Sequence, residues 1–291
     1  MKDKLIVSIQ KVYPDLSIND YRLNEIGQNN DVLIVNDSLV FRFPKYKSGI
    51  IQLKREAEIL KYIRTNVSVS TPDLIYNFFH ESDPGKVFTG YKIIDGEPFW
   101  RKSLLAIKDK GKVIGLAAQL IAFLAEIHSI TGEKVSRELN LEIHHPREEM
   151  YELYEKIQQK LYPFMNNVAQ EKVSKSFLGF LKGEALSNVQ ATLIHGDFGA
   201  SNILWNPGSY EISGIIDFGG SGLGDPAYDF AGILASYGEE FFNMCISLYP
   251  GGAEIADRVK FYKSTFALQE ALHGVENDDT QAFENGIQDY R

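Results

Sequence analysis

Cysteine is almost missing from this chain of 291 residues, and so is any long uncharged apolar run. The single cysteine, Cys245 in FFNMCISLY, excludes an internal disulfide and favours a reducing compartment, with the thiol packed in a core. The most apolar helical window, LAAQLIAFLAEIHSI, is interrupted by Gln119 and Glu126, so we expect no membrane span. The first residues have no long apolar core and no small-residue cleavage site. We therefore expect a cytoplasmic protein without a membrane partner.

An excess of positive charge is also missing. The formal net charge is −9, and residues 210–291 contain 14 Asp and Glu against 4 Lys and Arg. Nucleic-acid binding relies on basic surfaces, so we expect no nucleic-acid partner. An acidic C-terminal part favours a cationic small-molecule ligand, and a solvated acidic face is the alternative.

Several familiar binding motifs are absent as well. The chain has no internal repeat, no Walker motif and no G-x-G-x-x-G in its first hundred residues. GGSGLG, at 219–224, lacks that spacing and precedes DPAYDF, which is not a strong helix start, so we interpret it as a flexible segment. His144 and His145 are adjacent and have no evident third ligand, so zinc is not expected. His128 is interpreted as a structural histidine at a helix end.

Hydrophobic periodicity divides the chain into a strand-rich first part and a helical second part. Alternating apolar residues predict strands over 21–27, 31–36, 38–44 and 86–94, with Asn36-Asp37 as a hairpin turn. Helical spacing predicts helices over 4–13, 49–65, 112–130 and 146–165. We predict an α+β protein with a small antiparallel-sheet domain over 1–95 and a larger helical domain over 96–291.

The chemistry concentrates in two short stretches of the second part. HGDFGASN places His195, Asp197 and Asn202 after an apparent strand, and IIDFG places Asp217 at the end of another. Carboxylate and carboxamide oxygens suit Mg²⁺, which usually takes few protein ligands and completes its shell with water and phosphate. A carboxylate that does not bind metal can accept a hydroxyl proton, so the set suits phosphoryl transfer.

The spacing matches the kinase signature H-R-D-x-x-x-x-N followed by D-F-G, with Gly196 in place of Arg. Together with GQNNDVLIVNDSLVFRFPK and SGIIDFGGSGLGDPAYDF, these stretches resemble the aminoglycoside phosphotransferases, most of all the 2''-phosphotransferases, over nearly the whole chain. The resemblance implies a bilobal, protein-kinase-like fold that uses ATP or GTP and Mg²⁺. Asp197 would be the catalytic base or hydroxyl-orienting carboxylate, and Asn202 and Asp217 would hold the metal. His195 is expected to orient the catalytic loop.

A kinase-like nucleotide site also needs a cation on the third strand and a glutamate on the next helix. LVFRFPK supplies Arg42, whose guanidinium can bind phosphate at two points, and Lys45 is a nearby alternative. KREAEIL offers Glu56 and Glu58, and the family pattern points to Glu56.

Three further segments are candidates for nucleotide contacts. The carboxamides of Asn29 and Asn30 in GQNND could touch phosphate, although an ordinary polar hairpin turn explains them equally well. By the resemblance, backbone groups from Lys92 to Ile94 would meet the base at the hinge. Tyr91 would narrow the pocket beside it, which leaves ATP and GTP both open.

The acceptor is predicted from the acidic residues near the C-terminus. The resemblance implies a polycationic aminoglycoside, for which Glu239, Glu240 and Glu270 are candidate ligands. The 2''-phosphotransferases usually carry an acidic pair just before the segment matching YGEEFF, where this chain has Ala235-Ser236.

Three functions remain open from the sequence. The first is an aminoglycoside kinase, the second a kinase of the same fold for another small alcohol such as a macrolide, choline or a sugar-like metabolite. The third is a non-catalytic nucleotide-binding module, disfavoured because Asp197, Asn202 and Asp217 are all present. No long exposed apolar stripe is evident, so we expect a monomer.

Overall fold

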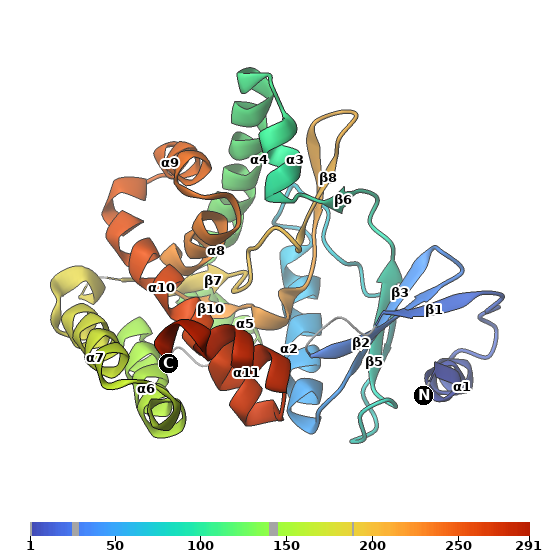
Figure 1. The fold of residues 1–291 in the computed structure, drawn as a ribbon. Helices are drawn as coiled ribbons and strands as arrows, with labels where there is room; N and C mark the ends of the chain where they lie inside the picture. Colours follow the sequence, from blue (N-terminus) through green and yellow to red (C-terminus); the bar gives the residue numbers. More distant parts are fainter. Residues whose placement is uncertain (1, 25–28, 140–144, 188) are drawn as a thin grey trace. The chain divides into compact units, whose positions relative to one another are not determined.

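The computed structural model describes residues 2–24, 29–139, 145–187 and 189–291 (Figure 1). Its backbone forms two compact units. Unit 1 comprises Met1–Ile127 and His195–Ser221, and unit 2 comprises His128–Ile194 and Gly222–Arg291. The division between a nucleotide-binding domain and a helical domain at residue 95 stays a prediction.

Unit 1 contains a five-stranded antiparallel sheet with the order β1-β2-β3-β5-β4 and a three-stranded sheet with the order β6-β8-β9. Its strands are β1 (Tyr21–Asn24), β2 (Asn30–Val35), β3 (Leu39–Pro44), β4 (Tyr76–Phe78), β5 (Phe88–Lys92), β6 (Glu97–Pro98), β8 (Ile203–Asn206) and β9 (Glu211–Ile215). Its helices are α1 (Lys2–Val12), α2 (Lys47–Ile63), α3 (Arg101–Ala106), most of α4 (Lys110–His128) and the short 3-10 helix η3 (Phe218–Gly220).

The predicted hairpin between β2 and β3 is confirmed. Asn36 and Asp37 have positive φ angles, 51° and 47°, and are the central residues of a β-turn in which the Ser38 amide donates to the Val35 carbonyl at 3.1 Å. Asparagine and aspartate tolerate this left-handed conformation better than most residues. The turn sets the register in which Val35 pairs with Leu39.

Successive side chains along β2 and β3 point to opposite faces of the sheet, and the two faces pack against different helices. One face buries Leu33, Val35 and Phe41 against Leu5 and Ile9 of α1. The opposite face carries the intervening side chains, and α2 lies on that side (Figure 1). The α+β prediction is confirmed. Strand β4 was not predicted, because three residues at a sheet edge are too few to show the alternation of a strand.

Unit 2 is mainly helical. Its helices are α5 (Gly132–Leu139), α6 (Pro146–Lys160), η1 (Tyr162–Phe164), α7 (Asn167–Lys182), η2 (Glu184–Leu186), α8 (Ala227–Tyr237), α9 (Glu239–Leu248), α10 (Gly252–Asn277), α11 (Thr280–Ile287) and η4 (Gln288–Tyr290). A two-stranded antiparallel sheet joins β7 (Thr192–Ile194) to β10 (Gly222–Gly224). The long helix α10 packs against α6, α8, α9 and α11.

The interpretation of GGSGLG as a flexible segment is wrong. Gly222–Gly224 forms the buried strand β10, and Gly222 pairs with Ile194 of β7. A Cβ on Gly224 would lie 2.6 Å from Cδ1 of Ile194, so glycine here permits close packing. DPAYDF does begin a helix: α8 starts at Ala227, whose amide donates to the Asp225 carboxylate at 3.0 Å.

Two predictions about buried polar residues are confirmed. His128 ends α4, where its Nε2 donates to Asp229 Oδ2 and its Nδ1 accepts from the Tyr249 hydroxyl, both at 3.0 Å. Cys245 is fully buried, and burial raises the pKa of its thiol to about 12. Both residues therefore have structural roles in unit 2.

Among the described residues, α4 is the one helix whose length and composition would allow it to cross a membrane. Its apolar window has a mean hydropathy of 1.3, and 44% of that window is buried within the protein. Leu120, Phe123 and Leu124 are buried. We therefore assign α4 to the protein core.

Candidate active site

Arg42 lies at the centre of a buried charged cluster in unit 1. It sits on β3 between Phe41 and Phe43, whose rings pack on the α1 side, so the guanidinium projects from the opposite face. Arg42 forms an ion pair with Glu56 of α2, and its Nη2 lies 2.7 Å from Asp217 Oδ1. Arg42 is 6% exposed and Glu56 is 3% exposed.

The alternatives to these two residues are placed elsewhere. Glu58 is exposed on α2, whereas Glu56 is on the buried face of the same helix. Lys45 is partly exposed, and its Nζ lies 4.0 Å from Asp31. The structure therefore brings together Arg42, Glu56 and Asp217, which are separated by up to 175 positions in the chain.

The charges of this cluster stabilise one another. Burial alone would lower the pKa of Arg42, but Glu56 and Asp217 outweigh burial and raise it well above its usual value. Burial raises the pKa of Glu56, while Arg42 and the Phe218 amide oppose that shift because both favour the carboxylate. For Asp217, burial acts to raise the pKa, but Arg42 and the Gly219 amide lower it overall. Asp217 is therefore held as an anion beside a permanent cation.

His195 connects the catalytic loop to the segment that follows β9. Its Nδ1 accepts a hydrogen bond from the Asp197 amide at 3.2 Å, and its Nε2 lies 3.1 Å from the Ile216 carbonyl oxygen. Because a carbonyl can only accept, Nε2 carries the proton and the ring is neutral in this arrangement. The side chain is fully buried. This geometry suits a histidine that orients the loop.

Asn202 holds the carboxylate of Asp197. Its Nδ2 donates to Asp197 Oδ2 at 2.8 Å and to the Asp197 carbonyl at 2.9 Å. Since the nitrogen is engaged in this way, Oδ1 is the atom of Asn202 that can serve as a ligand. Asn202 is buried, whereas Asp197 is exposed on unit 1. A buried amide thus positions an accessible carboxylate.

Asp217 adopts a strained backbone conformation. Its φ of 61° and ψ of 72° are left-handed, which costs a non-glycine residue about 1–3 kcal/mol at such sites. The Ile216 amide donates to the Asn202 carbonyl at 2.9 Å, so Asp217 follows directly from a segment paired with the catalytic loop. Its Oδ1 accepts from Arg42 and from the Gly219 amide. Such strain is typical of residues whose direction serves a function.

These oxygens suit a Mg²⁺–nucleotide complex. Asn202 and Asp217 offer a carboxamide and an anionic carboxylate from adjoining segments, which are hard oxygen donors. Two protein ligands are enough, because Mg²⁺ takes its remaining oxygens from phosphate and water. Among the residues that the structure describes, no group of three or more His, Cys, Asp and Glu could hold a metal.

The other predicted nucleotide residues are near the first sheet of unit 1. Tyr91 is buried on β5 opposite Val40, and burial raises its pKa to about 12. Lys92 is exposed at the end of β5, and Ile94 packs against Gly214 of β9. Their nucleotide contacts stay predictions.

Asn29 and Asn30 lie at the beginning of β2. Asn29 is exposed, and its carbonyl accepts from the Lys45 amide at 2.9 Å. Asn30 is the first residue of β2 and pairs with Pro44. Gly27 and Gln28 of the same loop, and His144 of the histidine pair, are outside the described residues. Phosphate contacts by the two asparagines stay predictions.

Ser221 is a further residue of the site, and no sequence motif points to it. Its hydroxyl donates to the His195 carbonyl at 2.9 Å, and the residue is 2% exposed. It therefore joins the end of η3 to the start of the catalytic loop. A serine four residues after an aspartate has no spacing that would have indicated this contact.

The backbone at position 196 requires glycine, where protein kinases have arginine. Its φ is 78°, and a Cβ at this position would lie 2.1 Å from the Gly220 carbonyl oxygen. The loop containing Asp197 and the loop following Asp217 therefore touch through their backbones. Only glycine combines the left-handed φ with this approach.

Gly196→Ala is therefore expected to lower the free energy of unfolding by about 2–4 kcal/mol, from the left-handed φ and the overpacked contact. Urea denaturation measures the change. Gly115→Ala is the control, because this helical glycine has no heavy atom within 4 Å of a built Cβ. Equal stability of the two variants would contradict the assigned contact.

The predicted acceptor residues belong to unit 2. Glu239 and Glu240 are exposed in the first turn of α9. Glu270 lies on α10 and accepts a hydrogen bond from Asn285 at 3.3 Å. Their contact with an acceptor stays a prediction.

Comparison with known proteins decides the family. Residues 20–262 match the model of the phosphotransferase enzyme family, APH. The chain belongs to this phosphotransferase family. It is an enzyme of that family, and the resemblance stated from its motifs is confirmed.

Relatives of this phosphotransferase act on several kinds of antibiotic, as their names state. Viomycin phosphotransferase of Streptomyces vinaceus is 33% identical over 150 residues, and the match spans about half of each chain (50% and 51%). The GDP and kanamycin complex of APH(2")-IIIa has a TM-score of 0.87 and 24% identity, covering 97% of this chain and 95% of that one. Macrolide 2'-phosphotransferase type I has a TM-score of 0.77 and 16% identity, covering 100% and 97%. At these identities the two structures establish the kinase-like fold.

Proposed function

We propose that this phosphotransferase moves the γ-phosphate of ATP or GTP to a hydroxyl group of an aminoglycoside, with Mg²⁺ bound. The single observation that supports this most is the paired geometry of unit 1. Arg42, Glu56 and Asp217 form one buried cluster, and Asn202 holds Asp197 beside the segment that leads to Asp217. Phosphoryl transfer needs one group of residues to bind phosphate and another to activate the hydroxyl, and these two sets of residues match those tasks.

Each side chain then has a stated task. Arg42 would bind the phosphates through the guanidinium nitrogen atoms not taken up by Glu56 and Asp217, and Glu56 would hold it in position. Asn202 Oδ1 and the Asp217 carboxylate would hold the metal, which neutralises charge on the phosphates when bound. Asp197 Oδ1 or Oδ2 would orient the acceptor hydroxyl and take its proton, while Asn202 and His195 keep the loop in place.

Aminoglycosides are proposed as acceptors because solved structures of the same fold contain kanamycin and gentamicin. The exposed Glu239 and Glu240 at the start of α9 would attract such polycations. We propose a soluble cytoplasmic monomer for this enzyme, with no nucleic-acid or membrane partner.

A second candidate is phosphorylation of another small alcohol. Ala235 and Ser236 stand where an acidic pair was expected, so part of the attraction for a polycation is missing. Relatives named for viomycin and macrolides show that the family includes other acceptors.

A panel of acceptors with ATP and with GTP tests these proposals. Release of nucleoside diphosphate and the mass of the phosphorylated product are measured for aminoglycosides, viomycin, a macrolide and choline. Transfer to an aminoglycoside supports the first proposal, and transfer only to another acceptor supports the second. No transfer to any alcohol, with nucleotide still bound, would contradict both.

Asp217→Ala is expected to weaken binding of the magnesium–nucleotide complex about ten- to a hundredfold. Loss of a residue that only hydrogen-bonds to a metal ligand has an effect of this size, and loss of the ligand itself should cost at least as much. Isothermal titration with and without Mg²⁺ measures it. Glu211→Ala, an exposed acidic change in the same unit, is the control. Unchanged metal dependence in Asp217→Ala would count against the assignment.

A further inference from the structure

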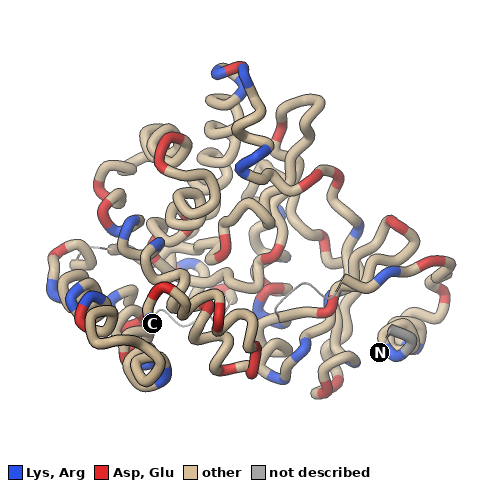
Figure 2. The backbone as a smooth tube through the Cα atoms, in the orientation of Figure 1, with Lys and Arg blue, Asp and Glu red and all other residues tan. Residues whose placement is uncertain are grey.

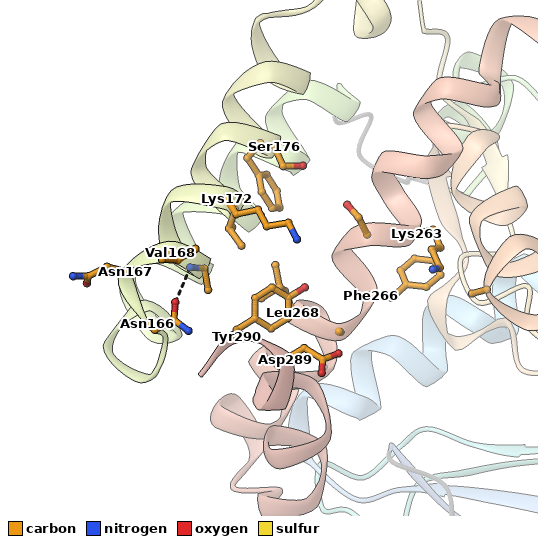
Figure 3. A pocket seen from close by; sticks show the side chains of 16 residues that line it. Asn166, Asn167, Val168, Lys172, Ser176, Lys263, Phe266, Leu268, Asp289 and Tyr290 are labelled. Atoms are coloured by element: carbon orange, nitrogen blue, oxygen red, sulfur yellow. Dashed lines mark hydrogen bonds between the residues drawn. The ribbon is translucent and has the colours of Figure 1, made fainter.

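Unit 2 contains a groove whose lining residues have no assigned role in the proposed reaction. It lies between α7 and α10, and η4 closes one end (Figure 3). Its volume is about 860 Å³, within the range of small-molecule sites. All of its described lining residues belong to unit 2.

The walls of the groove are largely apolar. Val173 and Phe177 are buried on α7, and Leu268 is buried on α10. Phe266 and Tyr290 add aromatic surface, and both are labelled among the lining side chains of Figure 3. A ligand that fills this space would therefore bring an apolar ring system.

Positive charge sits on these apolar walls. Lys172 extends from α7 into the space before α10, and Lys263 lies beside Phe266 on α10 (Figure 3). Neither lysine forms an ion pair with a residue in the described part of the chain. Asp289 is the one carboxylate among the described lining residues.

This balance is opposite to that of the surrounding sequence. Residues 210–291 contain 14 Asp and Glu against 4 Lys and Arg, but of these the groove takes only Lys263 and Asp289, and Lys172 of α7 adds a second lysine. The α7 helix carries three lysines, Lys172, Lys175 and Lys182, against one glutamate, and the tube shows both signs of charge on the neighbouring helices (Figure 2). Ala235 of α8, which carries no charge, also lines the groove. The groove therefore favours an anion over a polycation.

We propose that this groove is a binding site for an amphipathic small anion, a molecule that joins an apolar ring system to a carboxylate, sulfonate or phosphate. The rings occupy the space between Phe177, Leu268 and Tyr290. The anionic group pairs with Lys172 or Lys263, which gains a partner that the described residues do not supply. This proposal goes beyond the proposed phosphoryl transfer, and its test uses no turnover.

Fluorescence titration with 1-anilinonaphthalene-8-sulfonate tests the proposal on the full chain, because this probe has two apolar rings and one sulfonate. Saturable binding is expected for the wild type. The double variant Lys172→Glu/Lys263→Glu is expected to bind about tenfold or more weakly, since it replaces attraction by repulsion at short range. Lys175→Glu, an exposed change on α7 outside the groove, is expected to retain the wild-type affinity.

Two further arms make the result decisive. Ala235→Glu adds a carboxylate to the wall and is expected to weaken the sulfonate probe several-fold. The uncharged analogue N-phenyl-1-naphthylamine is expected to bind more weakly than the sulfonate and to be insensitive to the lysine changes. Thermal unfolding of each variant checks that the fold persists.

The proposal is overturned by equal affinity of the wild type and the double variant, by an equal loss in Lys175→Glu, or by equal binding of the uncharged analogue. None of these measurements depends on turnover. Asp197→Ala is expected to keep the probe affinity, so loss of phosphoryl transfer with intact probe binding would concern only the proposed function.

Discussion

Asp197→Ala is expected to lower kcat by about 10²–10⁴-fold while the magnesium–nucleotide complex still binds. A positioned carboxylate that takes a proton from the acceptor contributes a factor of this size. Arg42, which we propose to bind the phosphates, is held by Glu56 and Asp217, so nucleotide binding is expected to persist without the Asp197 carboxylate. Steady-state release of nucleoside diphosphate measures the first effect, and titration with nucleotide measures the second.

Asp197→Asn is the matched control for this result. Asparagine can still accept the hydrogen bond from Asn202 Nδ2 through its carbonyl oxygen, but it cannot take a proton. We therefore expect a loss of turnover close to that of the alanine variant, with the loop geometry preserved. Turnover at the wild-type rate in either variant would refute the role of Asp197.

Glu56→Ala is expected to lower the free energy of unfolding by about 3–5 kcal/mol, the cost of removing one partner from a buried ion pair. Arg42 is 6% exposed and would lose its principal carboxylate, and the Phe218 amide would lose its acceptor. Chemical denaturation measures the change. The Michaelis constant for nucleotide is expected to rise as well, because Glu56 holds the guanidinium in place.

Glu58→Ala provides the comparison within the same helix. Glu58 is exposed, two residues from Glu56. Exposed substitutions away from special features usually change stability by no more than about 0.5 kcal/mol. A similar cost for the two variants would show that the buried pair does not stabilise unit 1 in the way argued.

The catalytic loop was predictable because its chemistry is local. His195, Asp197 and Asn202 fall within eight residues, and their hydrogen bonds close within that loop or to Ile216. Separation in the sequence therefore predicts which of these side chains lie close together in space. The hairpin at Asn36 and Asp37 was predictable for a similar reason, since the turn depends on two adjacent φ angles.

The glycines were harder to interpret. The sequence favours a flexible segment for GGSGLG, because it lacks phosphate-loop spacing and DPAYDF is not a strong helix start. In the folded protein Gly224 packs on Ile194, and Gly220 touches the backbone at Gly196. Whether a glycine gives flexibility or permits close packing depends on the segment that lies next to it in the fold. A single sequence does not identify that segment.

By itself, the sequence determined the α+β class, the kinase-like spacing of the catalytic loop and the choice of residue types suited to phosphate and Mg²⁺. Only the tertiary structure decided that Glu56, and not Glu58, neutralises Arg42, that both meet Asp217, and that Lys172 and Lys263 share an apolar groove. The physical reason is that helix and strand periodicities act over a few residues. Buried charges, in contrast, are stabilised by partners that the fold brings from distant parts of the chain.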